Sequence, residues 1–127
     1  MPVEVLGSEI RRARPVLWRV TDRATFDGLR RRGHRARQGP LTVSFLAPPA
    51  GAAEQPPRVA FAVSKAAGGA VQRNRIRRRL RAALRELQLE GALPSGAYLV
   101  GATSSVATMP WSALVSLVRH TVAEAAR

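Results

Sequence analysis

The sequence predicts an α+β fold in which a mixed or mostly antiparallel sheet packs against helices. Segments with helical periodicity and segments with strand-like alternation follow one another in the order helix, strand, strand, helix, strand, helix. The chain has 127 residues, of which 46% are hydrophobic, and this is enough for one domain with one core. No uninterrupted apolar run approaches the roughly 20 residues of a membrane-spanning helix.

The N-terminal residues 1–15 differ from the remainder. They carry Arg11, Arg12 and Arg14 without an apolar period, so we expect a flexible basic arm, followed by a single folded domain over residues 16–127. The first four residues, Met1 to Glu4, lack the basic-then-apolar order of a secretory signal, and the chain has no cysteine. We therefore expect a cytoplasmic protein.

The first helix is predicted to begin after Thr21 or Asp22, since either is a good N-cap residue. Phe26 and Leu29 follow at i, i+3 spacing, which places them on one face. Gly33 ends the helix, directly after three arginines whose positive charge suits the C-terminal turn.

Three strands are expected. Leu41–Leu46 alternates apolar and polar side chains, and a second alternating run, Val59–Val63, follows a loose segment rich in proline and glycine. The third, Tyr98–Ala102, is short and apolar and is typical of a buried strand. If the second and third strands pair in parallel, the helix between them is their crossover, and the general handedness rule favours a right-handed one.

A long helix is predicted between the second and third strands, after the small residues 66–69, and it ends near Gly91 and Pro94. Its apolar residues fall on one side: Ile76, Leu80, Ala83, Leu84 and Leu87. A last helix is expected to start at Pro110. Its predicted inner stripe comprises Trp111, Leu114, Val115, Val118 and Val122.

The outer side of the long helix is strongly basic. Seven arginines lie between Arg73 and Arg85, and Glu86 is the acidic residue that follows them. A solvated charged face usually mixes both signs, so a polyanionic partner that relieves the mutual repulsion explains this face better. A leucine zipper is excluded, because Pro94 ends the pattern before several heptads can form.

The whole composition agrees with this interpretation. There are 21 basic and 8 acidic residues, a formal net charge of +13, and Lys65 is the lone lysine. Arginine binds phosphate through two parallel hydrogen bonds and stacks on bases, so RNA or DNA is the expected partner. An arginine bias inherited from base composition, or a polybasic contact with a membrane surface, are the alternatives.

Two motifs stand at a fixed interval around the start of this helix. They are Val63-Ser64-Lys65 and Arg73-Asn74-Arg75, with Phe26 and Gly33 upstream. This pattern closely resembles the protein component of bacterial ribonuclease P, and the resemblance extends from about Arg19 to the C-terminus.

The resemblance implies a two-layer α/β sandwich of the ribosomal S5 domain 2-like class, with a left-handed βαβ crossover. It also implies an accessory subunit of an endoribonuclease that binds the catalytic RNA and precursor tRNA, without a membrane partner, and removes the 5′ leader. The Mg²⁺ ions of the reaction are expected mainly on the RNA subunit.

Residue roles carry over only from the matching positions. The resemblance implies an RNA-contacting set of Arg73, Asn74, Arg75, Arg77, Arg78 and Arg81. It implies a cleft for the single-stranded leader that includes Phe26, Ser64 and Lys65. Four residues depart from the family pattern: Arg30, Ser44, Ala66 and Gly69. Phe26 has a core position beside Leu29 as its alternative, and Asn74 a cap in the first helical turn.

No catalytic or metal-binding residue is predicted in this chain. Glu86 and Glu90, at i, i+4, are the nearest approach to a metal site, and a solvated helix end explains them better. His34, expected in a loop, and His120, in the last helix, have no partner at catalytic spacing and are expected to be structural or close to phosphate. A ribosomal or RNA-chaperone domain without enzymatic function, and a nuclease that acts without RNA, are the competing interpretations.

Overall fold

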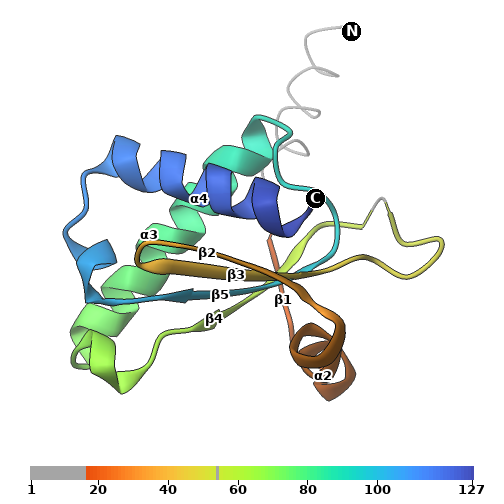
Figure 1. Ribbon diagram of the computed structural model, residues 1–127, viewed down its shortest axis with the longest axis horizontal. Helices are drawn as coiled ribbons and strands as arrows, with labels where there is room; N and C mark the ends of the chain where they lie inside the picture. The colour runs from red at the N-terminus through yellow and green to blue at the C-terminus, as the bar shows by residue number, and fades with distance from the viewer. Residues whose placement is uncertain (1–16, 54) are drawn as a thin grey trace, which may run out of the picture.

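The computed structural model describes residues 17–53 and 55–127, so the expected basic arm, residues 1–15, lies outside the described part. The described residues form a mixed five-stranded sheet with helices on both faces (Figure 1). The elements in chain order are β1 (Trp18–Arg19), α2 (Arg23–Arg32), β2 (His34–Gln38), β3 (Leu41–Leu46), β4 (Arg58–Ala62), the 3₁₀ turn η1 (Lys65–Ala67), α3 (Ala70–Leu89), β5 (Ala97–Ala102), the 3₁₀ turn η2 (Ser104–Ala107) and α4 (Trp111–Ala125).

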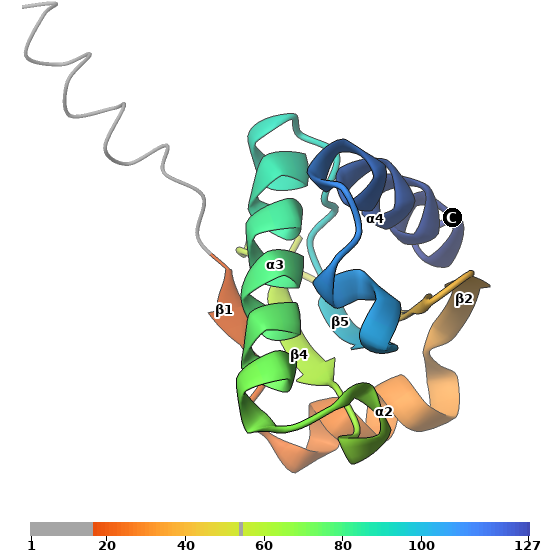
Figure 2. The same ribbon diagram turned by 90° about the vertical axis from the view of Figure 1, so that its left-hand side faces the viewer.

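The sheet has the strand order β1-β4-β5-β3-β2. β4 pairs in parallel with β1 and with β5, whereas β3 pairs antiparallel with β5 and with β2. α3 is the connection between the parallel neighbours β4 and β5, and the two ribbon views together show that this crossover is left-handed (Figures 1 and 2). The fold class implied by the resemblance is therefore confirmed, and the general expectation of a right-handed crossover is wrong for this chain.

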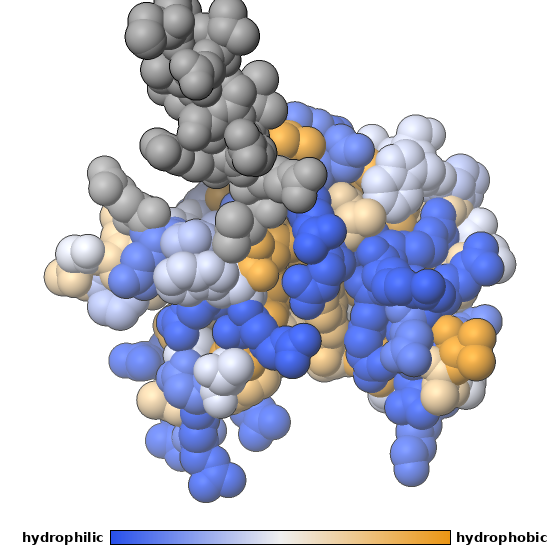
Figure 3. Space-filling view, turned by 180° about the vertical axis from the view of Figure 1, so that it is seen from behind, coloured by the Kyte–Doolittle hydropathy of each residue, from blue (hydrophilic) through white to orange (hydrophobic). Residues whose placement is uncertain are grey.

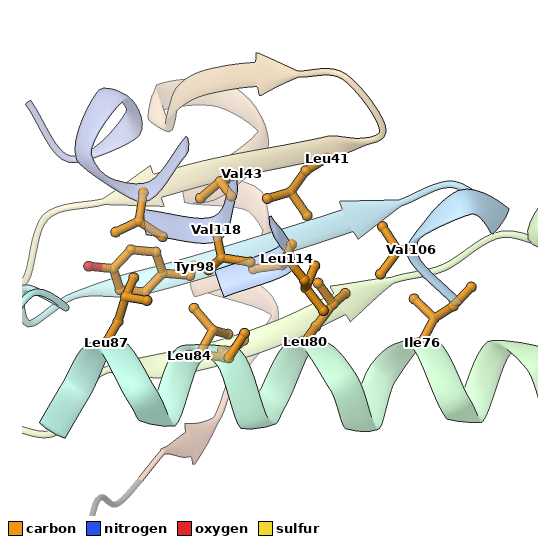
Figure 4. Close-up of a cluster of buried hydrophobic side chains, with 14 of the residues drawn as sticks. Leu41, Val43, Ile76, Leu80, Leu84, Leu87, Tyr98, Val106, Leu114 and Val118 are labelled. Atoms are coloured by element: carbon orange, nitrogen blue, oxygen red, sulfur yellow. The ribbon is translucent and has the colours of Figure 1, made fainter. Parts of the chain in front are cut away.

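The main core lies between the sheet and the layer formed by α3 and α4 (Figure 4). The apolar stripe predicted on α3, from Ile76 to Leu87, is fully buried. It packs against Val43 and Val100 of the sheet and against Leu114 of α4. Because one side of α3 is fixed in this core, its other side must face outward. None of the helices in the described part of the chain is both long and apolar enough to cross a membrane.

α2 lies against the opposite face of the sheet, where Leu29, Val20 and Ala97 form a smaller buried cluster. The predicted N-cap is confirmed: the carboxylate of Asp22 accepts a hydrogen bond from the Thr25 amide at 2.9 Å and another from the Thr25 hydroxyl at 2.6 Å. These two hydrogen bonds, aided by the charge of Arg58, lower the pKa of Asp22. Gly33 ends the helix as predicted.

Three details differ from the sequence-based expectation. His34 was expected in a loop but begins β2, an edge strand whose residues alternate poorly between apolar and polar. The strands β3 and β4 were expected to follow one another, yet β5 is inserted between them in the sheet. Trp111 was expected on the inner stripe of the last helix but is 41% exposed, because it occupies the first position of α4, beside α3.

Candidate nucleic-acid interface

The exposed side of α3 carries the seven arginines that the sequence places there. The backbone of α3 begins at Ala70, after Gly69, which has no side chain to cap it. Asn74 therefore lies in the second turn, so the interpretation of Asn74 as a first-turn cap is wrong. Its side-chain oxygen instead accepts a hydrogen bond from Arg77 Nη1 at 2.9 Å, which orients that guanidinium on the helix surface.

A groove runs between α3 and the strands β1 and β4 at the edge of the sheet. It has a volume of about 700 Å³. We call it the arginine groove, and its lining residues are Arg19, Val20, Val59, Ala60, Phe61, Val71, Asn74, Arg77, Arg78 and Arg81. Viewed from behind, the molecule shows apolar surface in a hollow between two groups of hydrophilic side chains (Figure 3). The groove thus combines a partly apolar floor with cationic walls, which suits a nucleic-acid strand.

Arg81 and Phe61 meet inside this groove. The Arg81 guanidinium carbon lies 5.4 Å from the centroid of the Phe61 ring. Partial burial and then the charges of Arg85 and Arg19 lower the pKa of Arg81. A lowered pKa at a residue surrounded by like charges means that the cation lacks compensation, and a bound phosphate would supply it.

Two arginines of α3 have a different role, because they hold the segment between β5 and α4. Arg79 donates hydrogen bonds from its two terminal nitrogens to the carbonyl oxygens of Val106 and Met109. Arg75 Nε donates to the Ala107 carbonyl at 3.1 Å. Arg79 was not among the predicted RNA-contacting residues, and its half-buried position agrees with a structural role. Arg75 was, and the structure gives it a partner within the chain as well.

The predicted leader cleft corresponds to the sheet face on the side of α2. Phe26 is half-buried there and packs against the smaller cluster, next to Leu46 and Leu99. It also lines a surface hollow of about 370 Å³ together with Thr21, Arg23, Asp27 and Arg30. Phe26 therefore contributes to the core and to an accessible surface at the same time.

Ser64 and Lys65 lie away from Phe26, at the other end of this face. Both are exposed, and they follow β4 directly at the start of η1 (Figure 1). They line neither the arginine groove nor the hollow beside Phe26. The structure thus brings the α3 set together at one surface, with Arg73 half-buried there, but it separates the three residues predicted for the leader cleft.

The sheet between these two ends presents small side chains. Ala62 is paired in register with Gly101, and Gly101 is paired with Thr42 on its other side. A Cβ atom at Gly101 would lie 3.3 Å from the Ala62 carbonyl oxygen, so a larger residue would fill this floor. On the neighbouring edge strand, Arg35 Nε donates to the Ser44 hydroxyl at 3.5 Å. Sequence reasoning missed this arginine because β2 itself was missed.

Phe45 does not contribute to this face. It points to the main core, where its ring centroid lies 5.0 Å from that of Tyr98. Ser44, the next residue, occupies the position on the α2 side and is buried. An aromatic platform is therefore missing from β3, and Phe26 is the aromatic residue on the described part of this face.

The carboxylates and histidines of the described residues do not form a metal site. No group of three or more histidine, aspartate or glutamate side chains lies close enough together in this part of the chain to hold an ion. Glu90, one of the pair at i, i+4 on α3, accepts hydrogen bonds from Arg119 through both carboxylate oxygens, at 3.2, 3.0 and 2.8 Å. His34 Nδ1 donates to the Ala125 carbonyl at 2.8 Å, which joins β2 to the end of α4.

Comparison with known proteins finds one family for this chain. The family model described as Ribonuclease P matches residues 15–126. The chain is 35% identical to a ribonuclease P protein component from Clavibacter michiganensis over 109 residues, which cover 86% of this chain and 93% of that protein. It is 46% identical to the component from Thermobifida fusca over 88 residues, 65% of this chain and 57% of that protein.

Solved structures agree on the fold. The ribonuclease P protein from Thermotoga maritima superimposes with a TM-score of 0.68 at 18% identity, covering 82% of this chain and 94% of that one. A mutant of the Staphylococcus aureus protein superimposes with a TM-score of 0.69 at 20% identity, covering 94% of this chain and 93% of that one.

Proposed function

Because the chain belongs to the ribonuclease P protein family, we propose that it is the protein subunit of a ribonuclease P ribonucleoprotein and binds the catalytic RNA through the arginine groove. The observation that carries this proposal is the convergence of Arg19, Arg77, Arg78 and Arg81 on one hollow with an apolar floor. Phosphate contacts supply most of the affinity of such surfaces and release counterions on binding.

The electrostatics of α3 favour an RNA partner over an unoccupied surface. Close pairs of like charges on a helix destabilise it by several tenths of a kcal/mol each. No item of negative charge on α3 offsets its arginines within the groove, since the groove lining contains no acidic residue. A folded RNA that places phosphates along the groove removes this repulsion, and the rigid core side of α3 keeps the arginines in position.

The substrate of the proposed complex is precursor tRNA, with its 5′ leader bound along the sheet face on the side of α2. Phe26 at one end supports this assignment, since an accessible ring can stack on an unpaired base. Lys65 at the other end offers a charge for the backbone, and Ser64 a hydroxyl. The small residues Ala62 and Gly101 leave room for a strand between them.

The chain assists the reaction by binding and positioning. The RNA subunit holds the Mg²⁺ ions that activate water, whereas the carboxylates of this chain do not fit an ion, because Glu90 is engaged by Arg119. The protein screens phosphate repulsion between the RNA subunit and the precursor, and it fixes the leader so that cleavage falls at the mature 5′ end. We expect this to take place in the cytoplasm.

Reconstitution tests the proposal. The chain is added to bacterial ribonuclease P RNA at low Mg²⁺, and removal of the 5′ leader from precursor tRNA is followed. Stimulation of cleavage by the protein is expected. No stimulation, with the RNA active alone at high Mg²⁺, would instead favour a ribosomal or RNA-chaperone domain. Cleavage by the protein without the RNA would identify a nuclease that acts alone.

A further inference from the structure

An exposed tryptophan lies beside the basic face of α3, outside the arginine groove. Trp111, the first residue of α4, is 41% exposed. It lines a separate surface hollow of about 410 Å³ with Arg75, Arg78, Arg79 and Ala82. Single exposed apolar residues are common on protein surfaces, but this indole has three guanidinium groups as its neighbours. A large aromatic surface surrounded by cations is the combination that binds nucleotides.

The indole is held in a fixed position. Arg79 donates hydrogen bonds to the carbonyl oxygens of Val106 and Met109, and Arg75 donates to that of Ala107. These carbonyls belong to η2 and to the turn that leads into Trp111, and Val106 and Ala107 are themselves buried. A ligand that stacks on the indole therefore orders little of the chain on binding, which favours affinity.

The hollow is continuous in composition with the surface proposed for the RNA subunit. Arg78 lines both the hollow and the arginine groove, so one guanidinium is shared by the two sites. The hollow is bordered by a single aromatic ring, which matches one base rather than a base pair. Its volume is in the lower part of the range of about 300 to 1,000 Å³ that is usual for ligand pockets.

We propose that Trp111, with Arg75 and Arg78, forms a binding site for one unpaired nucleotide of the RNA subunit. The base stacks on the indole, and Arg78 contacts its phosphate. This inference rests on the proposed function, because the nucleotide is supplied by the same RNA that occupies the arginine groove. It adds a contact on the other side of Arg78 and extends the interface to the start of α4.

The test uses the full chain and ribonuclease P RNA, with Trp18→Phe as the background, so that Trp111 is the one tryptophan left. We expect the RNA subunit to quench the fluorescence of Trp111 at the concentrations at which it binds. Trp111→Leu should weaken binding about tenfold, the size expected for one lost base stack. Trp111→Phe should retain most of the affinity, since its ring still stacks.

Two controls separate the stacking contact from charge and from folding. The salt dependence of binding should be unchanged in Trp111→Leu, because no phosphate contact is lost, and smaller in Arg78→Ala. Trp18→Leu, at a residue 46% exposed elsewhere on the surface, should bind as the wild type does. Equal melting temperatures of Trp111→Leu and the wild type would show that the fold is intact.

Failure of this inference differs from failure of the proposed function. Tight binding of the RNA subunit by Trp111→Leu, with no quenching in the single-tryptophan chain, would overturn the nucleotide site and leave the proposed function in place. Quenching by precursor tRNA but not by the RNA subunit would overturn the assigned partner. If the wild-type chain itself fails to bind the RNA subunit, the proposed function and this site are both wrong.

Discussion

Arg81 of α3 lies over the ring of Phe61 in β4, with its guanidinium carbon 5.4 Å from the ring centroid. This contact joins the cationic wall of the arginine groove to its apolar floor. It holds one guanidinium close to the sheet, while Arg77 and Arg78 line the same groove from positions earlier in the helix. The groove is therefore a defined binding surface rather than a row of independent charges.

Loss of two groove arginines should weaken binding of the RNA subunit and reduce its dependence on salt. For Arg77→Ala combined with Arg78→Ala, the slope of log affinity against log salt should fall by about 0.7 to 0.9 for each lost phosphate contact. The matched control is Arg119→Ala combined with Arg127→Ala, which removes the same charge from residues paired with Glu90 and Glu124. Equal slopes for the two double variants would remove Arg77 and Arg78 from the interface.

Phe26 should affect substrates with a leader more than those without one. Phe26→Ala removes a half-buried ring, so we expect unfolding to become easier by about 1 to 3 kcal/mol. If a base also stacks there, affinity for precursor tRNA should fall by about 1 to 3 kcal/mol more than affinity for leaderless tRNA. Phe26→Leu keeps most of the packing and should retain the leader-specific loss. Identical losses for both RNAs would assign Phe26 to the core alone.

Arg79 should matter for stability rather than for RNA affinity. Arg79→Met keeps the aliphatic stem but leaves the carbonyls of Val106 and Met109 without their donors. We expect a loss of about 1 to 3 kcal/mol in the free energy of unfolding, measured in urea. Arg78→Met, at the neighbouring exposed position, should change that free energy by no more than about 0.5 kcal/mol. The same small effect for both would argue against a structural role of Arg79.

The cap at Asp22 predicts a dependence of stability on acid. Its hydrogen bonds to Thr25 lower the pKa of Asp22 below the ordinary value of 3.8. The ionised form therefore favours folding, and this contribution is present above the unfolded pKa and lost as pH falls through the folded one. The melting temperature of the wild type should exceed that of Asp22→Asn at pH 7, and the difference should shrink near pH 3. A difference that stays constant with pH would contradict this origin.

The sequence predicts the elements with strong periodicity and misses those formed by pairing alone. α3 and β3 follow from their apolar patterns, because burial of one face imposes that pattern. β2 is an edge strand with mostly exposed residues, and β1 spans Trp18 and Arg19, so neither leaves a periodic signal. Their positions are set by hydrogen bonds to β3 and β4, which are distant interactions.

The site shows the same division. Helical spacing places the arginines of α3 on one side, but it cannot separate Arg79, which binds carbonyls about 30 residues later, from Arg78, which faces the groove. Helical spacing also places Trp111 with the apolar stripe of α4. Its exposure depends on where α4 begins and on the neighbouring side chains of α3, and neither can be derived from the sequence of α4 alone.

The central claim is that the arginine groove faces the catalytic RNA, and proximity cleavage tests it most directly. The chain has no cysteine, so a single introduced cysteine can carry a tethered iron chelate at a chosen position. Val71, 82% exposed, lines the groove, and Ala123 is an exposed residue of α4 outside it. We predict that the chelate on Val71→Cys cleaves the RNA subunit at discrete positions, whereas the chelate on Ala123→Cys does so weakly or not at all. Strong cleavage from Ala123→Cys and none from Val71→Cys would contradict the account.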